Sequence, residues 1–284
     1  MYLCNINGLL TKADSLTNII HQMDPSIVVL SETKASNEFV KSFFEKINYK
    51  VCVKSGSTVS SGGLVVAVKK NYGSPVNVTS STEPGILAAK LSFRGVNLRV
   101  IAVYGPQETV GIEDRRPFFE DLGVEVESCI TAGDFPIILG DFNGKIEFND
   151  GNILPCSSNG QFLSDIIQSN NIVTANYHPS CVGKWTRQNR KNPDEKSVLD
   201  YIFTGDRLYS AMSKVVIDED LLFTPFYWKN RTKQYTDHNA FYVSMEINLT
   251  REKPVKNKNC NRGWKITAEG LNKFTKITTT GDDS

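Results

Sequence analysis

Long apolar runs are missing from this sequence of 284 residues. None approaches the roughly 20 consecutive apolar residues that a helix needs to cross a bilayer, which argues against a membrane-spanning protein. The first residues also lack the basic stretch and apolar core of a secretory signal. We therefore expect an intracellular protein that does not engage a membrane.

Closely spaced cysteines are missing as well. The six cysteines are scattered along the chain without a C-x-x-C pair. A chain of this length can bury a sizeable core without disulfides. We therefore expect reduced thiols and no structural zinc site.

A strong net charge is the third absence, since the formal charge is only +1. Hydrophobic residues make up 40% and charged residues 22% of the chain, which is typical of a globular protein rather than a disordered or coiled-coil one. Residues 250–284 carry eight Lys and Arg against four Asp and Glu, while the preceding part is slightly acidic. We predict one domain over residues 1–249, followed by a basic polar tail or linker over 250–284.

Seven short segments rich in apolar and β-branched residues have the length and composition of buried strands. Apolar residues at helical spacing predict a helix that ends at Asp24-Pro25, another over 118–130 with a break near Gly123, and a third around 162–167. Strands joined by turns, with few helices, favour an α/β (α+β) fold in which a two-layer β-sandwich is flanked by helices. The predicted strands are 26–30, 63–68, 86–93, 96–103, 136–139, 198–203 and 240–247.

Polar residues follow or interrupt several of these strands. Glu32 follows one strand directly, and Asp141 and Asn143 follow another, spaced so that both side chains point the same way on extended backbone. Asp200 lies inside an apolar strand, where a carboxylate needs a partner such as His238. Taken singly, each has a simpler explanation, because Glu32 is typical of an exposed loop and Gly-Asp-Phe-Asn of a turn.

Six motifs follow one another along the chain: Asn5-Ile6-Asn7-Gly8-Leu9, Ser31-Glu32-Thr33-Lys34, Val103-Tyr104-Gly105-Pro106, Gly140-Asp141-Phe142-Asn143, Leu199-Asp200-Tyr201 and Thr236-Asp237-His238. In this order they resemble the endonuclease/exonuclease/phosphatase superfamily, whose members include deoxyribonuclease I and the apurinic/apyrimidinic endonucleases. Asn7, where cellular repair enzymes have Asp, resembles the endonuclease domains of non-LTR retrotransposons, as do the Tyr-Gly-Pro turn and Trp185-Thr186. The resemblance covers about residues 2–249 and implies a deoxyribonuclease I-like fold.

The resemblance implies phosphodiester hydrolysis assisted by a hard divalent ion, Mg²⁺ or alternatively Mn²⁺, that is held by oxygen ligands. Glu32 is the expected anionic ligand. Asn5, Asn7 and Asp237 are expected to contribute further oxygen ligands, partly through water.

The resemblance also implies the catalytic roles. Asp141 is expected to activate water, and Asn143 to orient the attack or the phosphate. Asp200 is expected to hold His238 in one tautomer and favour its charged form, so that the imidazole binds the phosphoryl oxygens. Tyr104 would donate to the same phosphate or assist the leaving group.

Two loops that combine basic and aromatic residues precede Asp200 and Asp237. Such loops suit contacts with phosphates and unstacked bases; the simpler alternative is a pair of solvated loops with ordinary surface lysines. The predicted nucleic-acid-binding residues are Lys184, Trp185, Arg187, Arg190 and Lys191 in the first loop and Lys229, Arg231 and Lys233, accompanied by Trp228 and Tyr235, in the second.

The leading hypothesis is a monomeric, Mg²⁺-dependent DNA endonuclease that nicks one strand for retroelement target-site cleavage. We expect it to act in the nucleus, with a reverse transcriptase domain as a partner in a longer polyprotein. One alternative is a phosphodiesterase or phosphatase of the same fold that acts on RNA or on a small phosphorylated molecule. The other is a binding module that has lost catalysis.

Overall fold

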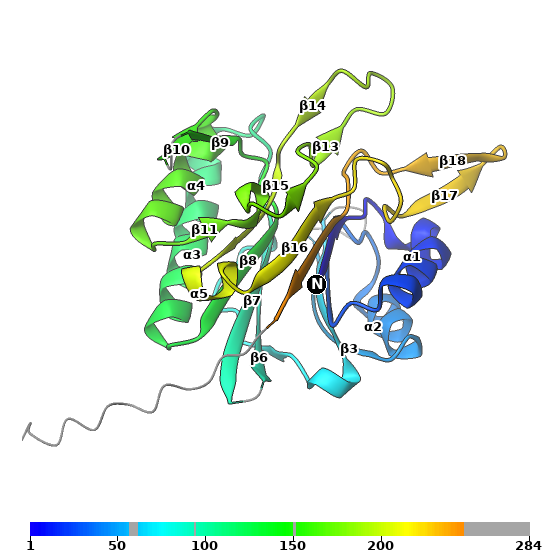
Figure 1. The fold of residues 1–284 in the computed structure, drawn as a ribbon, viewed down its shortest axis with the longest axis horizontal. Helices are drawn as coiled ribbons and strands as arrows, with labels where there is room; N and C mark the ends of the chain where they lie inside the picture. The colour runs from blue at the N-terminus through cyan, green and yellow to red at the C-terminus, as the bar shows by residue number, and fades with distance from the viewer. Residues whose placement is uncertain (57–61, 94, 150–151, 247–284) are drawn as a thin grey trace, which may run out of the picture. The chain divides into compact units, whose positions relative to one another are not determined.

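The computed structural model describes residues 1–56, 62–93, 95–149 and 152–246, and the predicted tail lies outside this part of the chain. Two sheets pack face to face, and helices cover their outer faces (Figure 1). This confirms the predicted α/β fold with a two-layer β-sandwich flanked by helices. Within the described ranges, no helix is long and apolar enough to span a membrane.

The larger sheet has seven strands in the order β12-β16-β19-β1-β2-β4-β3. Its centre is mixed, because β1 pairs parallel to β2 and antiparallel to β19. The bounds are β1 (Tyr2–Asn5), β2 (Ile27–Ser31), β3 (Tyr49–Lys54), β4 (Leu64–Lys69), β12 (Cys181–Val182), β16 (Met212–Ile217) and β19 (Phe241–Met245).

The smaller sheet has six strands in the order β11-β15-β8-β7-β6-β5. Its β7 pairs parallel to β8, whereas β15 runs antiparallel to β8. The bounds are β5 (Val76–Asn77), β6 (Ile86–Phe93), β7 (Val96–Tyr104), β8 (Phe135–Asp141), β11 (Val173–Thr174) and β15 (Asp200–Thr204).

Three two-stranded ribbons and five α-helices complete the described fold, together with two 3₁₀ turns. The ribbons are β9 (Ile146–Asn149) with β10 (Asn152–Pro155), β13 (Arg187–Gln188) with β14 (Lys196–Ser197), and β17 (Phe226–Lys229) with β18 (Thr232–Tyr235). The helices and turns are α1 (Leu9–Met23), α2 (Asn37–Lys46), α3 (Ile112–Thr131), α4 (Ser158–Ser169), α5 (Asp206–Tyr209), η1 (Lys70–Tyr72) and η2 (Ala175–Tyr177).

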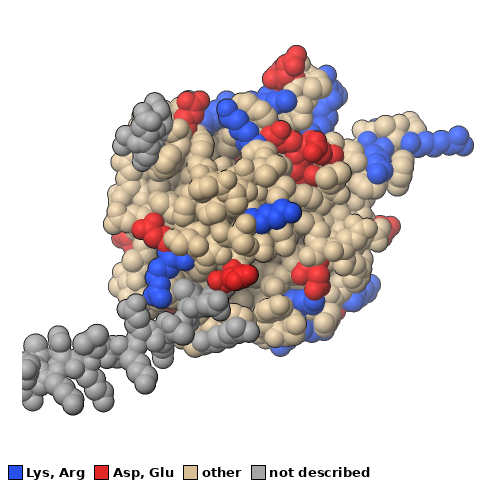
Figure 2. Space-filling view, in the orientation of Figure 1, with Lys and Arg blue, Asp and Glu red and all other residues tan. Residues whose placement is uncertain are grey.

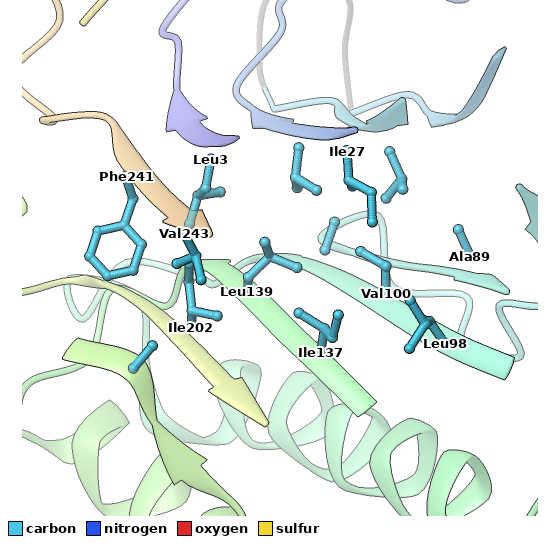
Figure 3. Close-up of a cluster of buried hydrophobic side chains, with 14 of the residues drawn as sticks. Leu3, Ile27, Ala89, Leu98, Val100, Ile137, Leu139, Ile202, Phe241 and Val243 are labelled. Atoms are coloured by element: carbon cyan, nitrogen blue, oxygen red, sulfur yellow. The ribbon is translucent and has the colours of Figure 1, made fainter. Parts of the chain in front are cut away.

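Three apolar clusters hold these layers together. The first fills the space between the two sheets, where residues such as Leu3, Val100 and Leu139 meet (Figure 3). The second lies between the smaller sheet and α3 and α4, and the third lies between the larger sheet and α1 and α2. Because the strands of the sandwich centre are covered on both faces, they are almost uniformly apolar, which made β2, β4, β6, β7 and β8 recognisable in the sequence, whereas the central β1 was not predicted.

The predicted break near Gly123 is wrong, because α3 runs without interruption from Ile112 to Thr131. Phe118, Leu122 and Val126 lie on both sides of this glycine and are buried against the smaller sheet. A glycine inside a helix costs about 1 kcal/mol relative to alanine. Burial of several large side chains outweighs that cost.

Strand register brings the polar residues to one end of the sandwich. Parallel pairing places Asn5 beside Ser31, the residue before Glu32, at the carboxyl ends of β1 and β2. The same pairing places Tyr104 beside Asp141 at the ends of β7 and β8. Polar residues that are far apart in the sequence therefore converge because the strands that precede them are parallel neighbours.

Gly140 allows this convergence, and we predict that Gly140→Ala is strongly destabilising. Its φ is +149°, and a Cβ at this position would lie 1.9 Å from the carbonyl oxygen of Val103 on the neighbouring strand. Relieving such a clash requires a backbone shift next to Asp141, and we expect a loss of at least roughly 2 kcal/mol of unfolding free energy in denaturant titrations.

Gly123→Ala is the matched control. A Cβ there would make an ordinary contact of 3.9 Å with Ile166. In the interior of α3 the same substitution should leave stability unchanged or raise it by up to about 1 kcal/mol. Equal effects of the two substitutions would contradict the steric role assigned to Gly140.

Candidate active site

A buried triad of Asp141, His238 and Asp200 forms the centre of the site. His238 Nδ1 lies 2.8 Å from Asp200 Oδ2, and His238 Nε2 lies 3.6 Å from Asp141 Oδ2. Asp141 and Asp200 are direct partners on the neighbouring strands β8 and β15. All three residues are at most 6% exposed, so their charges interact with little screening by water.

The two carboxylates determine the charge of the imidazole. Burial alone would lower the pKa of His238, but Asp200 and Asp141 outweigh it and raise the pKa well above its ordinary value. For Asp141, burial is the largest influence and raises the pKa of the carboxyl. The neighbouring imidazolium and the backbone N–H of Asn143 oppose this rise. At neutral pH the histidine is therefore charged and bridges two acids.

A second group of oxygen atoms surrounds Glu32. The Asn5 side-chain amide donates to Glu32 Oε1 at 2.9 Å and to Asp141 Oδ2 at 3.0 Å. Lys34 Nζ lies 2.7 Å from Glu32 Oε2 and 2.7 Å from Asn7 Oδ1. The Asn5 oxygen accepts from the backbone N–H of Asn7, so Asn5 presents a donor to Glu32 in this arrangement.

Hydrogen bonds keep Glu32 charged. Burial would raise the pKa of its carboxyl, but hydrogen bonds from Lys34 and Asn5 prevail and lower it. Glu32, Lys34 and Asn7 all have positive φ, at 52°, 45° and 44°. Such backbone is uncommon for residues other than glycine and clusters at functional sites.

The Glu32 group fits a hard cation better than the buried triad does. The Lys34 ammonium already bridges the Glu32 carboxylate and the Asn7 side-chain oxygen. These oxygen atoms therefore converge on a position that favours positive charge. In the triad, ligand atoms of Asp141, Asp200 and His238 lie within 4.8 Å of one another. A metal there would have to displace the proton of an imidazole that both carboxylates hold charged.

Tyr104 and Asn143 lie at the rim of the triad. The Tyr104 hydroxyl hydrogen-bonds with Glu32, and burial followed by the charge of Glu32 raises the pKa of the phenol, so it remains a donor. Asn143 donates its backbone N–H to Asp141 Oδ1 at 3.0 Å and its side-chain amide to the carbonyl of Gly105 at 2.8 Å. One N–H of that side-chain amide thereby links the loop after β8 to the loop after β7.

The first basic loop divides into internal and exposed cations. Arg187 forms an ion pair with Asp237 at 3.0 Å, so one oxygen of this predicted metal ligand already has a cationic partner. Arg190 donates to the carbonyl of Thr236 and to Asn239 Oδ1, both at 2.8 Å. These two guanidinium groups bind the segment that carries His238.

The remaining predicted nucleic-acid-binding residues lie at the surface. Lys184 and Lys191 are exposed, and the Lys184 ammonium lies 4.6 Å from the centroid of the half-buried Trp185 ring. Lys229, Arg231 and Lys233 are exposed on the β17–β18 ribbon. Figure 2 shows Lys and Arg side chains in the region of the β13–β14 ribbon at the top and of the β17–β18 ribbon at the right, with Asp and Glu side chains also present at the top.

The sequence analysis named the pair Trp185-Thr186 but missed that Thr186 orients the triad. The hydroxyl of the buried Thr186 accepts from the backbone N–H groups of Leu199 and Asp200 at 2.9 and 3.0 Å, and its carbonyl accepts from the N–H of Asn239. Thr186 thus links the strand of Asp200 to the segment of His238. A Thr beside an aromatic residue in a loop gives no local signal of this role.

Comparisons with known proteins come from a family model and from solved structures. Residues 3–238 match the model of the endonuclease/exonuclease/phosphatase family. No curated protein sequence matches the chain.

Several solved structures share the fold at low sequence identity. A 3′-5′ exonuclease from Neisseria meningitidis superposes with a TM-score of 0.68 and 18% identity, covering 86% of this chain and 98% of that one. An AP endonuclease from Archaeoglobus fulgidus gives 0.66 and 16%, covering 87% and 98%. The endonuclease domain of TRAS1, a telomere-specific non-LTR retrotransposon, gives 0.62 and 14%, also covering 87% and 98%.

We predict that Glu32→Gln removes most of the affinity for Mg²⁺. The substitution keeps the shape of the side chain but replaces the carboxylate that Lys34 now neutralises. A ligand that binds the folded state raises its stability, so Mg²⁺ at about ten times its Kd should add roughly 1.4 kcal/mol to the unfolding free energy of the unaltered chain. The measurement is a thermal melt at increasing MgCl₂, compared with KCl of equal ionic strength.

Glu120→Gln serves as the control, because Glu120 is an exposed acid on α3. It should retain the full Mg²⁺ effect. If Glu32→Gln is stabilised by Mg²⁺ as much as this control, Glu32 is not a ligand.

Proposed function

This chain belongs to the endonuclease/exonuclease/phosphatase family, and we propose that it is a Mg²⁺-dependent DNA endonuclease that nicks one strand. The observation that carries the proposal is the buried Asp141–His238–Asp200 triad beside the Glu32 group. A base, a fixed cation and oxygen ligands at the end of one sandwich are the components that phosphodiester hydrolysis needs.

Asp141 is the proposed base. Its Oδ1 is fixed by the backbone N–H of Asn143, and its Oδ2 accepts from Asn5 and faces His238 Nε2. Burial raises the pKa of this carboxyl, which makes it a better proton acceptor than an exposed Asp. Its proposed task is to take the proton of the attacking water.

His238 is the proposed cation that binds a phosphoryl oxygen. Asp200 accepts a hydrogen bond from His238 Nδ1–H, which fixes the ring so that the Nε2–H points toward Asp141 and the reaction centre. The Tyr104 phenol, kept protonated by its surroundings, can donate to the same phosphate or to the departing 3′ oxygen.

Glu32 and Asn7 are the proposed ligands of Mg²⁺, with Asn5 orienting Glu32. When bound, the cation would neutralise charge that develops on the phosphate. Lys34 would have to leave its position between these oxygens, which its partial exposure of 30% permits.

A DNA substrate is supported by the exposed cations of the two loops and by the nuclease neighbours. We extend the proposal to target-site cleavage by a retroelement, with a reverse transcriptase partner and action in the nucleus. The fold shared with the TRAS1 domain supports this extension.

Incubation with supercoiled plasmid tests the proposal. With Mg²⁺ we expect open circles, and with EDTA none. Hydrolysis of small phosphomonoesters without plasmid nicking would instead favour the phosphatase alternative.

In the same assay Asp200→Asn and His238→Ala should each reduce nicking by several orders of magnitude, and the double variant should be little worse than either. The two residues share a bond of 2.8 Å, and residues that act as one unit give strongly non-additive losses. Single-turnover rates measure this. Losses that multiply in the double variant would contradict a joint role.

Salt dependence separates surface contacts from internal ones. Lys184→Gln together with Lys191→Gln should weaken duplex binding and lower the slope of log Kd against log salt by about 0.9 per lost phosphate contact. Arg190→Gln should leave that slope unchanged and reduce turnover, because its guanidinium binds the His238 segment.

The control for charge alone is Lys41→Gln with Lys46→Gln, two lysines that are exposed on α2. An unchanged slope in the Lys184/Lys191 variant would exclude phosphate contacts by this loop.

A further inference from the structure

The β17–β18 ribbon has two faces of different character. Phe226 and Trp228 share one face because they are two residues apart on a strand, and their cross-strand partners are Tyr235 and Lys233. Tyr227 points to the opposite face. The ribbon projects from the molecule near α1 (Figure 1).

The face that carries Tyr227 is attached to α1. The Lys12 ammonium lies 5.5 Å from the centroid of the Tyr227 ring, and the backbone N–H of Phe226 donates to Ser15 Oγ at 3.2 Å. Lys12 is 4% exposed and also donates to the carbonyl of Asn7, beside the Glu32 group. The base of the ribbon is thereby joined to the loop of the proposed metal site.

The tip of the ribbon is a tight turn. Asn230 and Arg231 have φ values of 49° and 63°, as the two central residues of a type I′ turn require. This turn matches the twist of the strands. The contacts with α1 attach the base of the ribbon to the body, and the turn fixes the register of its two strands.

The outer face combines aromatic rings with positive charge. Trp228 is 64% exposed, and its ring is edge-on to Phe226 at 5.7 Å. Phe226 also lies 5.5 Å from Tyr235, and the Lys233 ammonium lies 4.4 Å from Phe226 and 5.8 Å from Trp228. Lys229 and Arg231 add exposed charge at the tip. Much of the indole surface is left in water beside a cation.

We propose that this outer face binds unpaired nucleotides that flank the cleavage site, with a base stacked on Trp228 and a backbone phosphate near Lys233. Stacking requires a base whose flat face is accessible, which a single strand offers and an intact duplex does not. The inference depends on the proposed nucleic-acid substrate and specifies its form: a duplex with a single-stranded or opened segment beside the cut.

Binding measured in EDTA with the full chain tests the inference without hydrolysis. The probe is a short fluorescein-labelled oligothymidylate, and a blunt duplex of similar length is the comparison. Trp228→Ala should weaken oligothymidylate binding by roughly 5- to 150-fold, the range expected for one stacked base. Its affinity for the blunt duplex should stay within about twofold, because stacking adds little there.

Two further variants test whether the loss of affinity is due to the missing aromatic ring. Trp228→Tyr keeps an aromatic ring and should restore most of the affinity, which a purely structural role would not require. Leu222→Ala removes a side chain that is 79% exposed outside the ribbon and should have no effect. Thermal melts of the variants establish that each is folded.

Unchanged oligothymidylate binding in folded Trp228→Ala overturns the inference, and so does an equal loss on the blunt duplex. The proposed nuclease activity is judged separately, by plasmid nicking with Mg²⁺. If the chain nicks plasmid and Trp228→Ala leaves oligothymidylate affinity unchanged, only the proposed stacking on Trp228 is refuted. A chain that needs Trp228 for oligothymidylate binding but does not nick refutes only the proposed catalysis.

Discussion

The side-chain amide of Asn5 joins the two sheets at their polar end. Asn5 ends the central strand of the larger sheet, yet it donates both to Glu32 on its own sheet and to Asp141 on the other. Without a donor between them, two carboxylates of opposite sheets would face each other across a largely dry interior, which is costly. The remaining polar groups of the site are arranged around the two acids that this amide holds together.

The imidazolium of His238 is the second constraint. Asp141 and Asp200 are adjacent on neighbouring buried strands, so one positive charge between them keeps the group from being a pair of uncompensated acids. Thr186 and Arg190 hold the backbone on which that charge depends. The site is thus a network in which structural and chemical roles belong to the same residues.

Much of the fold was predictable because both faces of the central strands are buried. Uniform apolar runs marked β2, β4, β6, β7 and β8 within a residue or two. The edge strand β3 was missed because Lys50 and Lys54 interrupt its pattern at the solvent side. Helix α2 was missed as well, since its ten residues bury little more than Val40 and Phe44. Weak periodicity of this kind does not stand out from a loop.

The site was predictable in its members and less so in its contacts. Motif order identified Glu32, Asp141 and His238, whose proximity follows from strand pairing. Sequence could not tell that Arg187 and Arg190 bind their own chain while Lys184 remains exposed, because a cation's partner depends on tertiary geometry. Only the folded chain distinguishes these uses of positive charge.

The two-residue turn of the β17–β18 ribbon also bears on how the molecule can diversify. The ribbon lies between β16 and β19, and its described attachment to the body runs through α1 rather than through the triad. Lengthening a surface loop costs little chain entropy, and loops on a rigid scaffold tolerate insertion. We expect relatives of this chain to carry ribbons of other lengths and compositions here, because this segment can change without disturbing the buried triad.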